Sequence, residues 1–224
     1  MSFFSIFKMT IPVLMGYIPL GMAFGLLLSN MLIPWYYAFF MSVFIFAGAG
    51  QFLALGLFAS HATILEIGVA TFLLNLRHTF YGLSMISALK NFSWKKNYVI
   101  FGLTDETFAL LKTNDIKEEE RERAYVIITA LNQSYWVIGS VIGALLGNIL
   151  PFNYKGIEFS LTALFVVLSI DLYNKSKQHK PFLISIVIGF IGMTIFPSDK
   201  MLILSLGLAA TVLILFKGAL EDGN

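Results

Sequence analysis

Long apolar stretches separated by short polar segments make up most of this chain, and they predict helices that cross a membrane. About twenty apolar residues cross a hydrocarbon core of about 30 Å. No segment of roughly ten residues alternates polar and apolar positions, as a β-barrel requires. The pattern predicts an all-α membrane protein forming one domain over residues 1–224. About seven transmembrane helices are expected, at residues 10–30, 35–60, 63–88, 124–148, 157–173, 181–196 and 200–217.

A different kind of segment, residues 89–123, separates the third and fourth stretches. Its apolar part is only the fourteen residues "YVIFGLTDETFALL" (98–111), which carry Asp105 and Glu106 at the centre. The solvated run "KTNDIKEEERER" follows. Because polar backbone at membrane depth needs protein or water around it, we expect a half-helix in the interface or a re-entrant segment. A full crossing is the alternative.

The distribution of lysine and arginine predicts the orientation. If residues 89–123 all lie on one side of the membrane, a topology with seven spans places eleven lysines and arginines on that side. The other side then has three, Lys8, Lys155 and Lys200. Cytoplasmic loops carry the excess of positive charge. The count therefore predicts a cytoplasmic C-terminus and an external N-terminus in the cytoplasmic (inner) membrane. A crossing by 98–111 would divide the charges nine to five, with the N-terminus inside.

The composition agrees with a membrane protein and narrows the chemistry. Hydrophobic residues make up 58% of the chain and charged ones 12%, about half the charged fraction of a soluble domain. The absence of cysteine excludes disulfides and thiolate chemistry. The three histidines lie in separate elements, and no zinc-protease, nucleophile-elbow or phosphate-loop motif occurs. We therefore expect no metal, no cofactor and no enzymatic activity, and the net charge of +2 gives no sign of a nucleic-acid partner.

A faint internal repeat relates the two halves, about residues 10–88 and 124–217. At an offset of 118 residues, "GMAFGLLLSNMLIP" lies over "GSVIGALLGNILP", so that Gly21 matches Gly139 and Gly25 matches Gly143. Equivalent helices three spans apart run in opposite directions, which predicts an inverted repeat of the kind found in secondary transporters. Two unrelated helices with small packing faces are the alternative.

Two further features lie in the spans of the first half. Pro12 and Pro19 lie in the first span and predict a bent or interrupted helix, with a kinked packing helix as the alternative. Gln51 follows the glycines of "FAGAGQF" in the second span. Its amide is a candidate ligand contact, or else a polar contact between helices.

Arg77 is the most unusual residue of the chain, since it lies near the middle of the third span. It is too far from the lysines after the span to reach the interface, so it must face protein or water. Arg77 shares a helix face with Tyr81 and Ser84, while Asn75 and His78 lie on the adjacent face. Such residues are candidates for function. The alternative is a structural ion pair with Asp171, Glu66 or Asp105.

Several of these segments together resemble the AzlC family of branched-chain amino acid permeases and exporters. They are "IPVLMGYIPLGMAFG", "FAGAGQFLAL", "NLRHTFYGLS", "TDETFAL" and "LNQSYWVIGSVIGALLG", and the resemblance covers about residues 10–217. It implies export of leucine, isoleucine or valine together with a small second membrane subunit, AzlD. An intramembrane enzyme and a non-transporting assembly subunit are the alternatives.

The resemblance also suggests roles for the candidate site residues. A zwitterionic amino acid needs a cation for its carboxylate and an acceptor for its ammonium group. Arg77, with His78, would serve the carboxylate, and Asp105 or Glu106 the ammonium group or a coupling proton. The two acids could instead be a solvated interfacial pair. Asn75, Tyr81 and Gln51 complete the predicted substrate-binding or coupling set.

Overall fold

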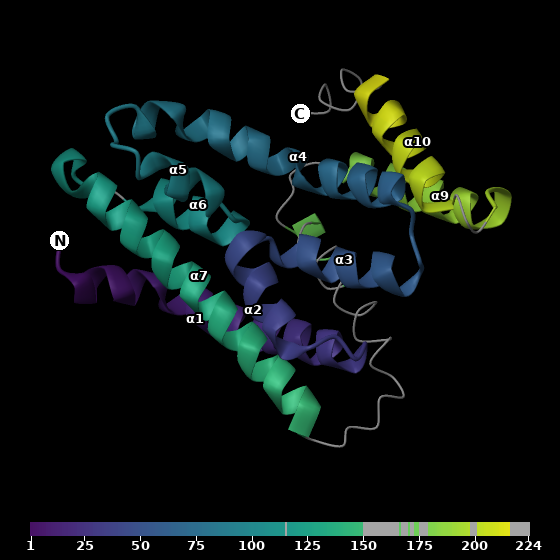
Figure 1. Ribbon diagram of the computed structural model, residues 1–224. Helices are drawn as coiled ribbons and strands as arrows, with labels where there is room; N and C mark the ends of the chain where they lie inside the picture. Colours follow the sequence, from purple (N-terminus) through teal and green to yellow (C-terminus); the bar gives the residue numbers. More distant parts are fainter. Residues whose placement is uncertain are drawn as a thin grey trace. The chain divides into compact units, whose positions relative to one another are not determined.

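The computed structural model describes residues 1–114, 116–149, 166, 170, 173–174, 179–197 and 201–215. The side chains of five of these residues, Arg77, Leu202, Ile203, Leu206 and Ile214, are not described. The described part is helical and contains no strand, which confirms the predicted all-α class (Figure 1). Its helices are α1 (Phe3–Asn30), α2 (Trp35–Phe44), α3 (Gly48–Ala59), α4 (Ile64–Leu89), α5 (Lys96–Phe101), α6 (Asp105–Thr113), α7 (Glu118–Ile149), α9 (Lys180–Ile195) and α10 (Met201–Leu215).

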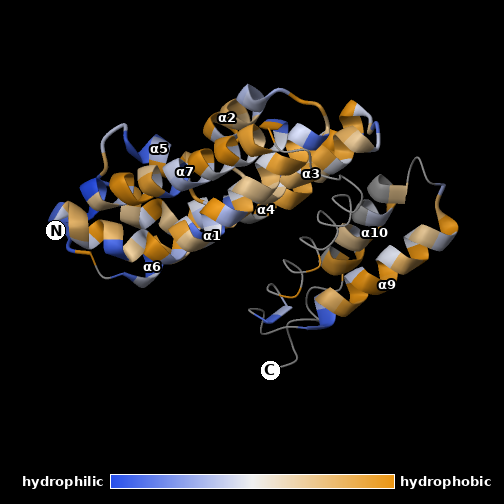
Figure 2. Ribbon diagram, turned by 90° about the horizontal axis from the view of Figure 1, so that it is seen from below, coloured by the Kyte–Doolittle hydropathy of each residue, from blue (hydrophilic) through white to orange (hydrophobic). Residues whose placement is uncertain are grey.

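Two of the described helices, α1 and α7, are long and apolar enough to cross a membrane. The 26 residues of α4 are about 39 Å long, which also exceeds the thickness of a bilayer core. Hydrophobic residues line these helices over most of their length, and hydrophilic ones gather near α5 and the start of α7 (Figure 2). Most of the predicted span 157–173, including Asp171, lies outside the described residues.

The chain forms two compact units. One consists of Met1–Leu55 and Asn75–Tyr154, and the other of Gly56–Leu74 and Lys155–Asn224. In the second unit α9 packs on α10, and the backbone leaves α9 just before Pro197. This confirms helices near the predicted ranges 181–196 and 200–217. The candidate site residues all belong to the first unit.

The most extensive packing between two helices of the first unit joins α1 and α7. Gly21 and Gly25 of α1 face Gly139 and Gly143 of α7, and a Cβ atom added to any of the four would meet backbone of the other helix at 2.9 Å or less. Small residues four apart let two helices approach this closely in a membrane. The first span is one continuous helix through Pro12 and Pro19, so of the predicted bend or interruption the interruption does not occur.

The two helices run in the same direction. At one end the amino group of Met1 pairs with the carboxylate of Glu120. At the other end Ser29 Oγ donates a hydrogen bond to Asn148 Oδ1 (3.0 Å). Both helices start at the same end of the pair in Figure 1. The inverted relation predicted for these two segments does not hold, because a parallel pair is not related by inversion.

The contacts between α1 and α7 are nevertheless reciprocal. Gly25 approaches Ser140 and Gly143 approaches Met22, and Ser140 is the residue that matches Met22 at the offset of 118. Gly21 approaches Trp136 and Gly139 approaches Ile18 in the same way. A two-fold axis along the pair produces contacts of this kind. The faint sequence repeat thus corresponds to a parallel, two-fold-related pair of helices.

The second predicted span, residues 35–60, is not a single helix. α2 ends at Phe44, and Phe46 has a φ of 43°, a backbone conformation that ends a helix. Gln51 Nε2 donates to Ser42 Oγ across the break (3.3 Å), although residues nine apart in one helix are separated by about 13 Å. The chain therefore turns at residues 45–47, and the continuous helix expected over 35–60 is divided there into α2 and α3.

α5 and α6 form a second pair that doubles back, now against α7. The ring of Phe92, before α5, lies against that of Tyr125 (5.6 Å between centroids). Further along, Asn132 Nδ2 donates to Thr107 Oγ1 (3.0 Å), and the chain then returns to Tyr125, whose hydroxyl donates to Leu111 O (3.1 Å). The segment between Phe92 and Leu111 thus begins and ends beside the same part of α7, so the chain doubles back here.

The two breaks meet inside the first unit. The rings of Phe46, in the first break, and Phe101, at the second, have centroids 6.4 Å apart. A Cβ atom added to Gly102 would lie 3.6 Å from the ring of Phe46. α3 and α6 both begin immediately after these breaks. Their N-terminal ends, which carry partial positive charge, therefore lie near the contact between α1 and α7.

A hydrophobic core holds the second pair in place. It lies between α5, α6, the end of α4 and the first halves of α1 and α7, and Met85 and Val99 are completely buried in it. The second half of α4 thus leads from the breaks towards the beginning of α7, antiparallel to α1 and α7. The core residues are Ile6, Met85, Leu89, Val99, Leu103, Leu111, Ile116, Ala124, Tyr125 and Ile128.

Candidate functional site

The candidate site is built around the first turn of α6. Thr104 caps this helix, because its Oγ1 accepts a hydrogen bond from the backbone N–H of Thr107 (3.2 Å). Asp105 and Glu106 follow in the first turn. A carboxylate is favoured at a helix N-terminus because the free N–H groups there carry partial positive charge. The local sequence therefore explains why α6 begins at this point with two acids.

Tyrosines from two other helices hold these acids. The Tyr81 hydroxyl of α4 donates to Asp105 Oδ1, and the Tyr17 hydroxyl of α1 donates to Glu106 Oε2, both over 2.7 Å. Asp105 is partly buried and Glu106 is exposed. The structure thus brings together the candidates Tyr81, Asp105 and Glu106, which lie in different elements. It also adds Tyr17 to the site.

Buried polar side chains continue the site towards α7. Thr104 Oγ1 lies 2.7 Å from the Tyr17 hydroxyl and donates to Thr107 Oγ1 (3.0 Å). Thr107 in turn accepts from Asn132, which is completely buried. Asn132 Oδ1 has no hydrogen-bond partner within the described part of the chain. Such a group costs about 1–3 kcal/mol when left unpaired, so this position favours a donor such as water or an ammonium group.

α4 supplies the remaining polar candidates. His78 lies edge-on to the ring of Tyr81 (5.7 Å, 84°), and both it and Asn75 are partly buried. Tyr81 also stacks on Phe108 of α6, with ring centroids 4.6 Å apart. This contact fixes the position of α4 along α6. The backbone of Arg77 lies one helical turn before Tyr81. Because residues four apart share a helix face, Arg77 belongs to the same face of α4 as Tyr81.

Of the alternative partners predicted for Arg77, Glu66 has another role. Its carboxylate accepts hydrogen bonds from the backbone N–H and the hydroxyl of Thr63 (2.7 and 2.8 Å) at the start of α4. Eleven residues of helix separate Glu66 from Arg77, which corresponds to about 16 Å. Asp105 is held against the face of α4 to which Arg77 belongs, and it remains the predicted partner within the chain.

Gln51 lies apart from the two acids and is completely buried. Its Oε1 accepts from Trp136 Nε1 (2.8 Å), and its Nε2 donates to Ser42 (3.3 Å). Both ends of the amide thus have partners that fix the turn between α2 and α3. The Trp136 ring in turn lies edge-on to Tyr17 (5.5 Å, 76°). Within the described residues, this indole ring links Gln51 to the site.

Four residues of the site were not among the sequence candidates, namely Tyr17, Thr104, Thr107 and Asn132. One of them had a signal in the sequence: Asn132 is a polar residue inside an apolar span, where such residues are uncommon. Tyr17 and the two threonines carry no such signal, since tyrosine and threonine are ordinary in membrane helices. Within the described residues, no group of three His, Asp or Glu side chains could hold a metal ion.

Comparison with known proteins identifies clear relatives of this chain. The family described as "AzlC protein" matches residues 12–150. The chain is 39% identical to an "Uncharacterized membrane protein" of Helicobacter pylori (strain ATCC 700392 / 26695) over 98% of this chain and 97% of that protein. It is 31% identical to the "Branched-chain amino acid transport protein AzlC" of Bacillus subtilis (strain 168), over 100% of this chain and 88% of that protein. No solved structure gives a significant match.

Proposed function

Since the chain belongs to the AzlC family of membrane transport proteins, we propose that it moves leucine, isoleucine and valine across the cytoplasmic membrane, in the direction of export. The Bacillus subtilis relative is named for branched-chain amino acid transport. One observation supports this role most strongly. Two neighbouring carboxylates at the start of α6 are held by tyrosines from α1 and α4, where two broken helix pairs meet. Transporters often bind substrates at such broken helices.

The substrate's two charges are assigned to different helices in this proposal. Arg77 of α4, with His78 and Asn75 beside it, binds the carboxylate. Asp105, which is partly buried and bonded to Tyr81, accepts the ammonium group. The aliphatic side chain needs an apolar surface, which the phenylalanine- and leucine-rich interior offers.

Glu106 is assigned to the coupling proton because it is exposed and is bonded to the Tyr17 hydroxyl. A glutamine at this position keeps the shape and removes the titratable group. We expect Glu106→Gln to retain exchange of labelled for unlabelled leucine within about twofold. Net gradient-driven transport should fall by at least about tenfold, since no proton is carried. Both rates are measured in the same reconstituted vesicles.

Asp105→Asn is the matched comparison, because it removes the neighbouring charge in the same turn of α6. If Asp105 binds the substrate, this variant loses exchange and net transport together. Loss of exchange in Glu106→Gln, with Asp105→Asn unaffected, would reverse the two assignments.

The proposed topology follows from the parallel α1 and α7 and differs from seven spans. α2 with α3, and α5 with α6, each turn back, so α1, α4 and α7 are the crossings in the first unit. These three helices, of which α4 begins in the second unit, together with the predicted crossing at 157–173 and with α9 and α10, give six crossings. Both termini then lie on the side of residues 89–123, which the charge distribution makes cytoplasmic. A cytoplasmic C-terminus is retained, and the N-terminus moves to the same side.

Labelling from one side of the membrane tests this topology. The chain contains no cysteine, so single cysteines at Ser2, Lys95 and Lys117 can be labelled without background. We expect all three to react with an impermeant reagent from the cytoplasmic side only. Labelling of Ser2→Cys from outside, with Lys117→Cys labelled from inside, would restore the seven-span topology.

A small second subunit similar to AzlD completes the proposal, as the family resemblance implies. The test is transport of labelled leucine and valine in vesicles that contain this chain with and without the small subunit. A transporter shows uptake and counterflow. Absence of both with the small subunit present would leave an assembly subunit or an intramembrane enzyme as the function.

A further inference from the structure

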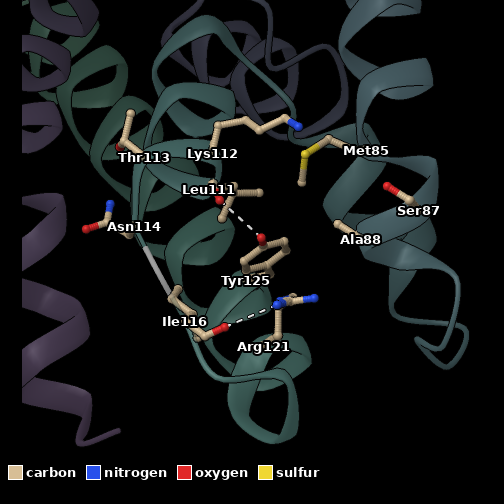
Figure 3. Close-up of a pocket in the computed structure, with 10 residues that line it drawn as sticks. All are labelled: Met85, Ser87, Ala88, Leu111, Lys112, Thr113, Asn114, Ile116, Arg121 and Tyr125. Atoms are coloured by element: carbon tan, nitrogen blue, oxygen red, sulfur yellow. Dashed lines mark hydrogen bonds between the residues drawn. The ribbon is translucent and has the colours of Figure 1, made fainter.

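A cavity of about 490 Å³ lies away from the two tyrosine–carboxylate pairs, at the other end of α6. It opens between the ends of α4 and α6, the connection between α6 and α7, and the first turns of α7 (Figure 3). Its apolar lining includes Met85 and Ala88 of α4 and Leu111 of α6. The proposed transport function uses none of these residues.

Two basic side chains border this cavity. Lys112 belongs to the last turn of α6, and Arg121 to the beginning of α7. Figure 3 shows both extending towards α4, which contributes Ser87 on the facing side. Neither makes an ion pair with another residue of the described part of the chain, and no acidic residue is among the described residues of the wall. The cavity therefore presents two positive charges and a hydroxyl group.

Carbonyl groups at the end of α6 would repel an anion, but side chains of the cavity and its rim bond them. The Tyr125 hydroxyl donates to Leu111 O (3.1 Å), as Figure 3 shows. Thr113 Oγ1 donates to Ala109 O and Asn114 Nδ2 to Leu110 O, both over 2.8 Å. These bonds satisfy the last carbonyls of a helix. Among the described residues of the wall, Lys112 and Arg121 then carry the full charges.

We propose that this cavity binds the phosphate group of an anionic phospholipid from the cytoplasmic leaflet. It lies at the end of α4 followed by Lys90, Lys95 and Lys96, the level at which lipid headgroups meet a membrane protein. Basic pockets between helices on this side of a membrane bind such headgroups. Lys112, Arg121 and Ser87 donate to the phosphate oxygens, and the apolar wall receives the start of an acyl chain.

The charge of the wall favours a phosphate over an amino acid in transit. A zwitterion needs an acceptor of negative charge for its ammonium group, and the described wall offers only neutral acceptors such as Ser87 and Asn114. A phosphodiester of phosphatidylglycerol has no ammonium group. It matches two cations beside an apolar surface, and arginine and lysine both bind phosphate oxygens through charge-assisted hydrogen bonds.

Lipid retention tests this assignment. The purified chain is incorporated into nanodiscs containing phosphatidylglycerol and phosphatidylcholine, released into mild detergent, and its bound lipids are counted by native mass spectrometry. Lys112→Gln together with Arg121→Gln should weaken phosphatidylglycerol binding about thirtyfold, at about fivefold for each charge removed. Lys117→Gln removes a charge from the same connection outside the cavity wall and should retain the lipid as the unchanged protein does.

Three further results decide the matter. Equal retention of phosphatidylglycerol by the double variant and the unchanged protein would overturn the proposal. So would stabilisation by inorganic phosphate alone without retained lipid, since the source would then be a free anion. If the double variant unfolds, Arg121→Lys with Lys112→Arg keeps both charges and should bind the lipid; failure of this folded variant to do so overturns the site as well.

Discussion

Replacing Arg77 with lysine is expected to remove most amino-acid transport while the protein remains folded in the membrane. Lysine keeps the positive charge but lacks the planar pair of donors that binds a carboxylate in two places. A hydrogen bond to a charged group contributes about 1.5–3 kcal/mol, so transport should fall by roughly ten- to a hundredfold. Uptake and counterflow of labelled leucine measure the loss, and the amount of protein in the membrane serves as the reference.

A structural role for Arg77 leads to a different result. If Arg77 only neutralises Asp105, lysine serves nearly as well and Arg77→Lys transports normally. Arg77→Ala would then leave a buried carboxylate unpaired at a cost of about 3–5 kcal/mol, and the amount of protein would fall. Adding Asp105→Asn to Arg77→Ala would restore it. Normal transport by a well-expressed Arg77→Lys variant contradicts the carboxylate-binding role.

A single methyl group at Gly25 is expected to separate α1 from α7. Its Cβ atom would overlap the carbonyl oxygen of Ser140, which is backbone and cannot move aside as a side chain does. Overpacking typically costs about 1–3 kcal/mol, and a clash with backbone lies at the upper end of that range. Gly25→Ala should therefore unfold at a clearly lower temperature in detergent. The fluorescence of the three tryptophans follows the transition, because Trp136 is buried at this contact.

Gly16→Ala is the control in the same helix. A Cβ atom at Gly16 has no neighbour within 4 Å, so the variant should be as stable as the unchanged protein or slightly more so. The reciprocal contacts add a further expectation: Gly143→Ala should destabilise as much as Gly25→Ala. The double variant with Gly25→Ala and Gly143→Ala should lose less stability than the sum of the two single losses, because either methyl group alone already separates the two helices. Additive effects would argue against a shared contact.

The sequence predicted the helices of this chain well because long apolar stretches have few other structures in a membrane. The turn at residues 45–47 was missed for the same reason. The segment is apolar on both sides of the break, and no proline or charge marks it. What breaks the helix is packing: Gly48 lies against the Trp136 ring, and Gln51 bonds to Ser42. Such long-range contacts leave no periodic signal.

The residues of the site also divide into those that the local sequence could predict and those that it could not. Arg77, Asp105 and Glu106 could be singled out because charge is costly in an apolar chain. Helical spacing placed Tyr81 on the face of Arg77, and the structure joins Tyr81 to Asp105. Tyr17 could not be assigned in this way, since nothing local connects residue 17 with residue 106. The direction of the repeat was missed because it was inferred from the number of spans, whereas contacts at both ends of the pair show that α1 and α7 are parallel.

The parallel contact of α1 and α7 also has a consequence for synthesis of the protein. α1 enters the membrane first, but its glycine surface has no partner until the matching residues, 118 positions later, leave the ribosome. At about 5–20 residues per second, this takes roughly 6–24 s. During that interval Gly21 and Gly25 are open to lipid, to the insertion machinery or to α1 of another chain. Early steps of assembly must therefore protect one helix surface until the second half of the contact is made.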